Sequence, residues 1–428
     1  MSHLIFIRSW IAISIVGLVL VAILNIAVDP YGIFGTPRIE GFNAIKPSIG
    51  TKVRTAKVHQ VLKIRPKAVI IGNSRPEMGL DPEHPCWPET SRPVYNVAIP
   101  GLSVYGQIRY GQHAIASGET DLVLIGLDFI DFLVPPELDR DPRQWPVSSE
   151  EPMPLRTDAN GEPRPAFVWD RLKDQLGATM SLDALTDTGV TLVLQRPGAA
   201  TTRTPLGFNP GHLIFAPIIR HEGARVLFAQ KNESLARRLS TKSWSLNHHQ
   251  TDWSTQFEAL SRLMDQGQDA GIRIIPFINP LHADFLVLID KAGLWPLMDA
   301  WKRRVVTMAA EHGSGPLWDF IDFAGYATES VDDLAAKGEG LRWFWEPSHY
   351  RRSLGDRLLS AMLADSCPKG TIEPPLGTAL KPTSIEAHLA RLRSERDRFI
   401  AANRSRVDML TALIDAVRPA DRLSSARH

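Results

Sequence analysis

The chain has 428 residues, of which 44% are hydrophobic and 22% are charged, so it is long enough for one large α/β domain with additions, and its composition is globular. Its 48 Lys and Arg residues are balanced by 47 Asp and Glu residues. Because proteins that bind nucleic acid usually carry a clear basic excess, this balance argues against a nucleic-acid partner.

A long apolar run near the amino terminus predicts a membrane anchor. Residues 10–28 read WIAISIVGLVLVAILNIAV, 19 residues without a charge, and a helix of about 20 apolar residues spans the hydrocarbon core of a bilayer. The run continues into Asp29 and Pro30 instead of ending at a cleavage site, which favours an uncleaved anchor over a signal peptide. Since Arg8 precedes the run, the positive-inside rule places residues 1–9 in the cytoplasm and the main domain in the periplasm or outside, anchored by a single pass in a bacterial inner membrane.

After a connecting region at 29–66, apolar runs typical of buried strands alternate with stretches whose apolar residues have helical spacing. The strands are expected at 67–71, 122–125, 272–278 and 317–323, and the helices at 104–117, 253–268, 295–311 and 354–363. Strands that alternate with helices predict an α/β fold with a parallel sheet covered on both faces.

Residues 133–250 interrupt this alternation. The stretch is rich in Pro, Arg and Asp and contains the scattered tryptophans Trp145, Trp169 and Trp244. Because long loops in compact domains are usually functional or have structure of their own, we expect an insertion that forms a lid or substrate platform over the carboxyl edge of the sheet. Its apolar segments disfavour the alternative, a disordered linker.

The carboxyl-terminal region follows a linker expected at 371–382. Thr383 and Glu386 form a capping-box pattern, and apolar residues at helical spacing follow. This pattern predicts one amphipathic helix over 383–418. Such a helix can pack on its own domain, pair with a partner or lie on a membrane, and packing is the commonest outcome.

The only two cysteines, Cys86 and Cys367, are too few for a zinc site or a disulfide framework. In an oxidising compartment they can form one long-range bridge, and two unpaired buried thiols are the alternative. His248 and His249 lack a third ligand at a recognisable spacing. We therefore expect no metal and no cofactor.

A nucleophile is predicted at Ser74, in the segment IIGNSR directly after the first strand. A sharp turn there presents the hydroxyl at the carboxyl edge of the sheet, where open α/β sheets bind ligands. The competing interpretation is a helix cap, because Ser and Asn at such turns often accept a hydrogen bond from the next turn's amides.

A base is predicted at His349, in the segment FWEPSHY that precedes the last helix of the domain. An imidazole takes a serine proton only if another group fixes its tautomer and supports its positive charge. Glu346, three residues earlier, is the expected carboxylate. Taken alone, the pair would be better explained as a surface Glu and a structural His.

In their order and spacing these motifs resemble the SGNH (GDSL-like) hydrolase superfamily. Gly72, Asn73 and Ser74 match its first block, and residues 96–101 resemble its second, which supplies a glycine. The resemblance covers about 67–132 and 271–367, and it implies a flavodoxin-like three-layer sandwich over 67–370. It also implies that the oxyanion hole includes the backbone amides of Ser74 and Gly101.

The sequence departs from that family at two positions. In the third block Asp128 stands where an asparagine amide normally helps to hold the oxyanion, and an ionised carboxylate would repel the developing charge. Asp128 is therefore either a protonated donor or outside the hole. Glu346 replaces the family's Asp, which is chemically tolerable because Glu occurs in convergent triads.

Four further polar residues are candidates for substrate binding. Asn73 and Arg75 flank Ser74, whereas Asn279 and His282 follow the strand at 272–278. For the latter two, a turn-capping Asn and an ordinary surface His are the competing interpretations.

An outward-facing domain of this type on a membrane anchor is similar to the alginate O-acetyltransferase proteins and the D-alanyl transfer protein of teichoic acid synthesis. The resemblance implies acyl transfer from Ser74 to a cell-envelope or secreted polysaccharide, with a multi-pass membrane-bound O-acyltransferase as partner. Ester hydrolysis uses the same nucleophile and base. A non-catalytic assembly or polysaccharide-binding subunit is the alternative from another class.

Overall fold

A computed structural model describes residues 2–135, 155–198, 200, 203–248, 251–334, 338, 340–369 and 376–418. Six strands form one sheet, in the order β2–β1–β3–β4–β5–β8. They are β1 (Ala68–Ile71), β2 (Val94–Asn96), β3 (Leu122–Leu127), β4 (Arg273–Ile278), β5 (Leu317–Asp319) and β8 (Thr378–Leu380). The first five strands run parallel, and β8 pairs antiparallel with β5.

The central strands are buried on both faces, as their continuous apolar runs predict. Successive side chains of a strand point to opposite faces of the sheet. In β1, Ala68 and Ile70 therefore belong to one apolar cluster, and Val69 and Ile71 belong to the other. The predicted α/β fold with a mostly parallel sheet is thus confirmed.

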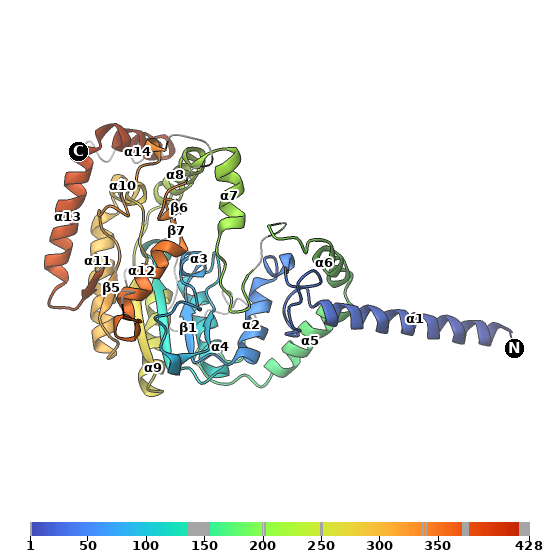
Figure 1. Ribbon diagram of the computed structural model, residues 1–428. Helices are drawn as coiled ribbons and strands as arrows, with labels where there is room; N and C mark the ends of the chain where they lie inside the picture. The colour runs from blue at the N-terminus through green and yellow to red at the C-terminus, as the bar shows by residue number, and fades with distance from the viewer. Residues whose placement is uncertain are drawn as a thin grey trace.

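Helices cover both faces of the sheet (Figure 1). One apolar cluster includes side chains of α2 (Val53–Ile64), α4 (Val104–Ser117), α9 (Thr255–Asp269), α10 (Ala283–Lys291) and α11 (Trp295–Glu311). The other includes side chains of α3 (Ser74–Gly79), α7 (His212–His221), the first half of α8 (Ala224–Ser240) and α12 (Arg352–Met362).

Three segments contain structure that the sequence pattern does not predict. The connecting region 29–66 contains α2, which packs on α4. The linker 371–382 contains β8, whose partner strand β5 is far away in the sequence. The helix over 383–418 is two helices, α13 (Ile385–Ala402) and α14 (Arg404–Val417), which meet at Asn403.

The break at Asn403 and the start of α13 can each be traced to the hydrogen bonds of one side chain. The Asn403 side-chain amide donates to the Phe399 carbonyl at 2.8 Å, and such local bonds compete with helical ones. The predicted capping box does not form, because the Glu386 carboxylate accepts from the guanidinium of Arg303 at the surface instead. Both helices pack on their own domain, with α14 against α8 and α10.

The described part of 133–250 is folded, which contradicts the disordered-linker alternative. It forms α5 (Phe167–Met180), α6 (Leu182–Val193), α7 and α8. The first two pack against the amino-terminal helix, and the last two cover the sheet. Trp145 lies outside the described residues.

The amino-terminal helix α1 (Ser2–Val28) is long and apolar enough to cross a membrane. It projects away from the body of the molecule (Figure 1). The helix extends the predicted span of 10–28 toward the amino terminus, so that the described residues of 1–9 are helical too.

Candidate active site

Ser74 lies at the point where β1 gives way to α3, at the carboxyl edge of the sheet. Asn73 is the helix cap, because its side-chain oxygen accepts a hydrogen bond from the Arg75 amide at 2.9 Å. Ser74 is the first residue of α3. The capping interpretation is therefore right for Asn73, and the Ser74 hydroxyl has another partner.

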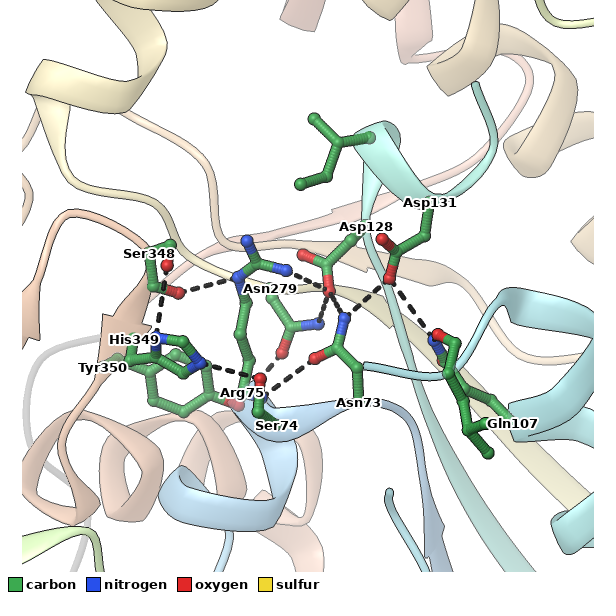
Figure 2. Close-up of polar contacts among 12 residues, drawn as sticks. Asn73, Ser74, Arg75, Gln107, Asp128, Asp131, Asn279, Ser348, His349 and Tyr350 are labelled. Atoms are coloured by element: carbon green, nitrogen blue, oxygen red, sulfur yellow. Dashed lines mark hydrogen bonds and ion pairs between the residues drawn. The ribbon is translucent and has the colours of Figure 1, made fainter. Parts of the chain in front are cut away.

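That partner is His349. The Ser74 Oγ lies 2.7 Å from the His349 Nε2, although 275 positions separate the two residues in the sequence (Figure 2). On the other side of the ring, His349 Nδ1 contacts the carboxylate of Glu346. The expected hydrogen-bonded array of Ser74, His349 and Glu346 is confirmed as a geometry.

The carboxylate of Glu346 is held in its ionised form. Burial alone would raise its pKa, but the charge and hydrogen bond of His349 outweigh burial and lower the pKa to about 2. The Ser348 hydroxyl also donates to Glu346 Oε1 at 2.8 Å. At neutral pH this carboxylate can therefore orient the imidazole and support its positive charge.

A close helix contact sets the spacing between Ser74 and His349. Tyr350, next to His349, covers Gly79 at the end of α3, where an added Cβ would lie 1.8 Å from the tyrosine ring. At Gly355 of α12 an added Cβ would lie 1.7 Å from the Gly79 carbonyl oxygen. The two glycines thus allow α3 and α12 to approach closely, which brings the two halves of the site together.

The strands β6 (Phe344–Glu346) and β7 (His349–Tyr350) form a two-stranded antiparallel sheet that carries Glu346 and His349. Its tight turn brings the carboxylate and the imidazole to the same place. The sequence pattern does not predict these two short strands.

Asp128 is a buried acceptor and does not donate into the site, so of its two expected positions, donor in the oxyanion hole or residue outside it, the geometry agrees with the second. Its Oδ2 accepts from the side-chain amides of Asn73 at 2.7 Å and Asn279 at 3.1 Å, and it lies 2.9 Å from the Arg75 guanidinium (Figure 2). Burial raises the pKa of Asp128, while Arg75 opposes that rise and Asp131 adds to it. Three donors surround this oxygen, so it serves to hold them.

Arg75 joins this network to the loop that bears His349. Its Nε donates to the Ser348 carbonyl at 2.7 Å. Although burial lowers the pKa of Arg75, the carboxylates of Asp128 and Asp131 raise it more, so the side chain stays cationic. Asn73 donates to Asp131 as well, at 2.8 Å. Both Asn73 and Arg75 border the site, and their role in substrate binding stays a prediction.

Asn279 and His282 do not reach the site, so their assignment to substrate binding is wrong. Asn279 is fully buried, accepts from the Tyr350 hydroxyl at 3.0 Å and donates to Asp128. His282 caps α10 and contacts the Glu329 carbonyl at 2.8 Å. Both residues follow a strand at the correct edge, but their side chains turn into the interior.

Ser74 and His349 open into a pocket of about 380 Å³. Gly101 borders it with a φ of +73°, a conformation that glycine adopts without strain. One wall comes from the 133–250 insertion, through Lys231, Leu235, Arg238 and Trp244. The insertion therefore lines the site, as a substrate platform would.

Six polar side chains of the pocket were not predicted from the sequence. They are Ser103, Asp131, Lys231, Arg238, Gln256 and Ser348. Asp131 and Ser348 lie within or beside the recognised motifs, so adjacency was a usable signal. Lys231 and Gln256 come from helices remote in sequence, and only the fold places them here.

Among the residues that the structure describes, no group of three His, Cys, Asp or Glu side chains is placed to hold a metal ion. His248 lies 3.3 Å from the Thr255 hydroxyl, and His249 falls outside the described residues. Cys86 and Cys367 form a disulfide that joins the chain before β2 to the segment after α12.

This arrangement can activate a hydroxyl. A serine at a strand–helix turn, an imidazole on its oxygen and a buried carboxylate on the other ring nitrogen are the parts required for nucleophilic catalysis at a carbonyl. No family model matches the chain, and no curated protein matches it either.

Proposed function

We propose that the chain is an SGNH-like, membrane-anchored serine O-acyltransferase that acts on a cell-envelope or secreted polysaccharide. The observation that supports this most directly is the 2.7 Å contact between Ser74 Oγ and His349 Nε2, with Glu346 on the other ring nitrogen. The strand order 2–1–3–4–5 is that of flavodoxin-like doubly wound folds, which agrees with the three-layer sandwich of the SGNH superfamily.

In the proposed reaction, Ser74 Oγ attacks the carbonyl carbon of an activated acyl donor while His349 Nε2 takes the hydroxyl proton. The backbone amides of Ser74 and Gly101 stabilise the oxyanion of the tetrahedral intermediate. The intermediate collapses to an acyl-serine, and His349 returns the proton to the leaving group. A sugar hydroxyl then attacks the acyl-serine, with His349 as its base, and the ester product leaves Ser74 free.

The anchor favours transfer at a membrane over hydrolysis in solution. Helix α1 would hold the domain at the periplasmic face of the inner membrane, where a multi-pass membrane-bound O-acyltransferase can supply the acyl group. Hydrolysis remains the alternative within the same mechanism, since water can resolve the acyl-serine in place of a sugar. A non-catalytic binding subunit is the alternative that the position of Asp128 favours, because it leaves the oxyanion hole with two backbone donors.

The first prediction separates an enzyme from a binding subunit. A fluorophosphonate probe, which reacts with activated serines, should label the purified full-length protein at Ser74, and Ser74→Ala should lose the label completely. His349→Ala should lose it as well, because the hydroxyl then has no base. Equal labelling of all three proteins, or none of any, would reject the catalytic proposal.

Transfer and hydrolysis are then separated by the fate of an acyl group from an activated ester. Added polysaccharide should increase the turnover of the ester and become O-acylated if the protein is a transferase. Unchanged turnover with free acid as the only product would indicate an esterase.

A further inference from the structure

Helices α5 and α6 carry an apolar surface that the rest of the described chain does not cover. On α5, Trp169, Leu172, Leu176 and Met180 recur at steps of three and four residues, which places them on one side of the helix. On α6, Leu182 and Val193 are 81% and 77% exposed. Together with the four residues of α5, they form what we call the apolar stripe. Side chains of this size and exposure on neighbouring helices mark an interaction surface.

This surface is continuous with the membrane anchor. Helix α1 packs against both α5 and α6, which lie beside its base (Figure 1). Asn25 of α1 is fully buried between them, since its amide donates to the Thr179 carbonyl at 2.9 Å and its oxygen accepts from the Thr188 hydroxyl at 2.8 Å. Most other apolar side chains of α1, including Ile23, Leu24 and Ile26 near its base, are exposed, so the two apolar surfaces adjoin.

Helices α5 and α6 pack on each other as a hairpin, and this α5–α6 hairpin is firmly joined to the end of the anchor helix α1. Asp187 of α6 accepts from the Tyr31 hydroxyl at 2.6 Å and from the Ser48 hydroxyl at 2.8 Å. Lys46 donates to the carbonyls of Val28 and Asp29 at 2.7 and 2.6 Å, where a positive charge complements the carboxyl end of a helix. The hairpin and α1 are therefore held at a fixed relative position.

The length of α1 places the hairpin at the outer boundary of the bilayer. Its 27 residues span about 40 Å at 1.5 Å per residue, more than the hydrocarbon core of about 30 Å. A core that begins just after Arg8 ends near the last turn of α1, which is where Asn25 holds the hairpin. The parts of α5 and α6 that contact Asn25 thus lie at the depth of the interface between acyl chains and headgroups.

We propose that α5 and α6 form a second membrane contact, in which their apolar stripe lies in the outer leaflet interface of the bilayer that α1 crosses. The composition fits such a position, because interfacial helices present Trp and Leu to the lipid and basic residues at the flank. Trp169 begins the stripe, and the exposed Lys173 borders it. Two attachments would prevent the domain from rotating freely about α1 and would fix the height of the pocket above the membrane.

The test uses nitroxide labels on full-length protein in vesicles of phosphatidylcholine and phosphatidylglycerol. Since both natural cysteines are in the disulfide, a label reacts only with an introduced cysteine. Leu176→Cys and Leu182→Cys report on the stripe. Arg171→Cys, exposed on another side of α5, and Met409→Cys, an exposed apolar residue of α14, are matched controls.

Labels at 176 and 182 should collide with oxygen, which concentrates in lipid, several times more than with a water-soluble nickel chelate. The two controls should show the reverse order. Ile13→Cys verifies that α1 is inserted. If the stripe labels match the controls while the Ile13 label reports lipid, the hairpin lies in water and the proposal is wrong. Shielding of the stripe labels from both reagents would also overturn it, because that result indicates a protein partner or a second copy. These outcomes do not depend on whether Ser74 is catalytic.

Discussion

Two buried carboxylates flank the candidate site, and they have opposite environments. Glu346 faces an imidazole, and its pKa is lowered to about 2, because the charge and hydrogen bond of His349 outweigh burial. Asp128 faces a guanidinium and two amides, and its pKa is raised, mainly by burial. The partner of Glu346 can gain and lose a proton during a reaction, whereas the partners of Asp128 cannot at neutral pH. Glu346 is therefore suited to assist a reaction, and Asp128 is suited to hold neighbouring side chains in place.

The largest expected effect tests the role of Glu346 in the reaction. In Glu346→Gln, the new amide can donate to His349 Nδ1, which moves the ring proton to Nε2, where it faces Ser74 and removes the base. We expect the kcat of the acyl reaction to fall by roughly 10³–10⁴. Because the lowered pKa of Glu346 means that its ionised form stabilises the folded state at neutral pH, we also expect a moderate loss of unfolding free energy. Steady-state kinetics and urea unfolding measure the two quantities.

The matched control is Glu233→Gln, which removes an exposed carboxylate of α8 that pairs with Arg237 at the surface. Exposed pairs contribute about 0–1 kcal/mol, so both quantities should stay unchanged. A Glu346→Gln enzyme with full activity would mean that the carboxylate does not assist His349.

The next largest expected effect tests the structural role of Asp128. Asp128→Asn removes the carboxylate that contacts the buried Arg75, and removing one partner of a buried ion pair costs about 3–5 kcal/mol. We expect a loss of unfolding free energy of that size, measured by urea unfolding. The activity of the protein that remains folded should fall far less than in Glu346→Gln.

Asp131→Asn is the control for Asp128→Asn, because the Arg238 side chain with which Asp131 pairs is 52% exposed and stays solvated when the charge of Asp131 is removed. It should cost less than half as much stability. If Asp128→Asn instead abolishes activity and leaves stability intact, Asp128 takes part in the reaction and the distinction between the two carboxylates is wrong.

The sequence alone predicts the array of Ser74, His349 and Glu346 better than it predicts the network around Asp128. Ser74, Glu346 and His349 were recognised because each lies in a short motif next to a strand or helix whose apolar pattern is local. The helices expected at 104–117 and 295–311 match α4 and α11 for the same reason. Local signals suffice where short-range geometry decides the structure.

The role of Asp128 could not be predicted in this way, because it depends on residues that follow three different strands. Asn73 follows β1, Asn279 follows β4, and Asp128 follows β3. Likewise β8 has its only described strand partner in β5, and Lys231 reaches the pocket from an insertion. These placements arise from tertiary packing, which single-sequence patterns do not record.

The smallest expected effect concerns Ser348, which contacts both Glu346 and His349 and has two possible roles. Its hydroxyl donates to Glu346 Oε1 at 2.8 Å and lies 3.2 Å from His349 Nδ1. If it only orients the carboxylate, Ser348→Ala removes one hydrogen bond to a charged group, worth about 1.5–3 kcal/mol. The Ser348 backbone amide still donates to Glu346 in the variant, so the carboxylate stays partly oriented. We expect kcat to fall about tenfold or less.

The alternative, that Ser348 is itself the nucleophile, makes a different prediction. Its oxygen is near the ring nitrogen that already contacts Glu346, whereas Ser74 has the other nitrogen. A base cannot receive a proton at a nitrogen that bears one, and a carboxylate partner keeps the proton on Nδ1. Kinetics of Ser348→Ala, with Ser353→Ala at the surface as control, together with mass spectrometry of the fluorophosphonate adduct, distinguish the roles. An adduct on Ser348, or a kcat as low as that of Ser74→Ala, would transfer the nucleophile to Ser348. An adduct on Ser74 with a modest fall in kcat would leave Ser348 as the residue that orients Glu346.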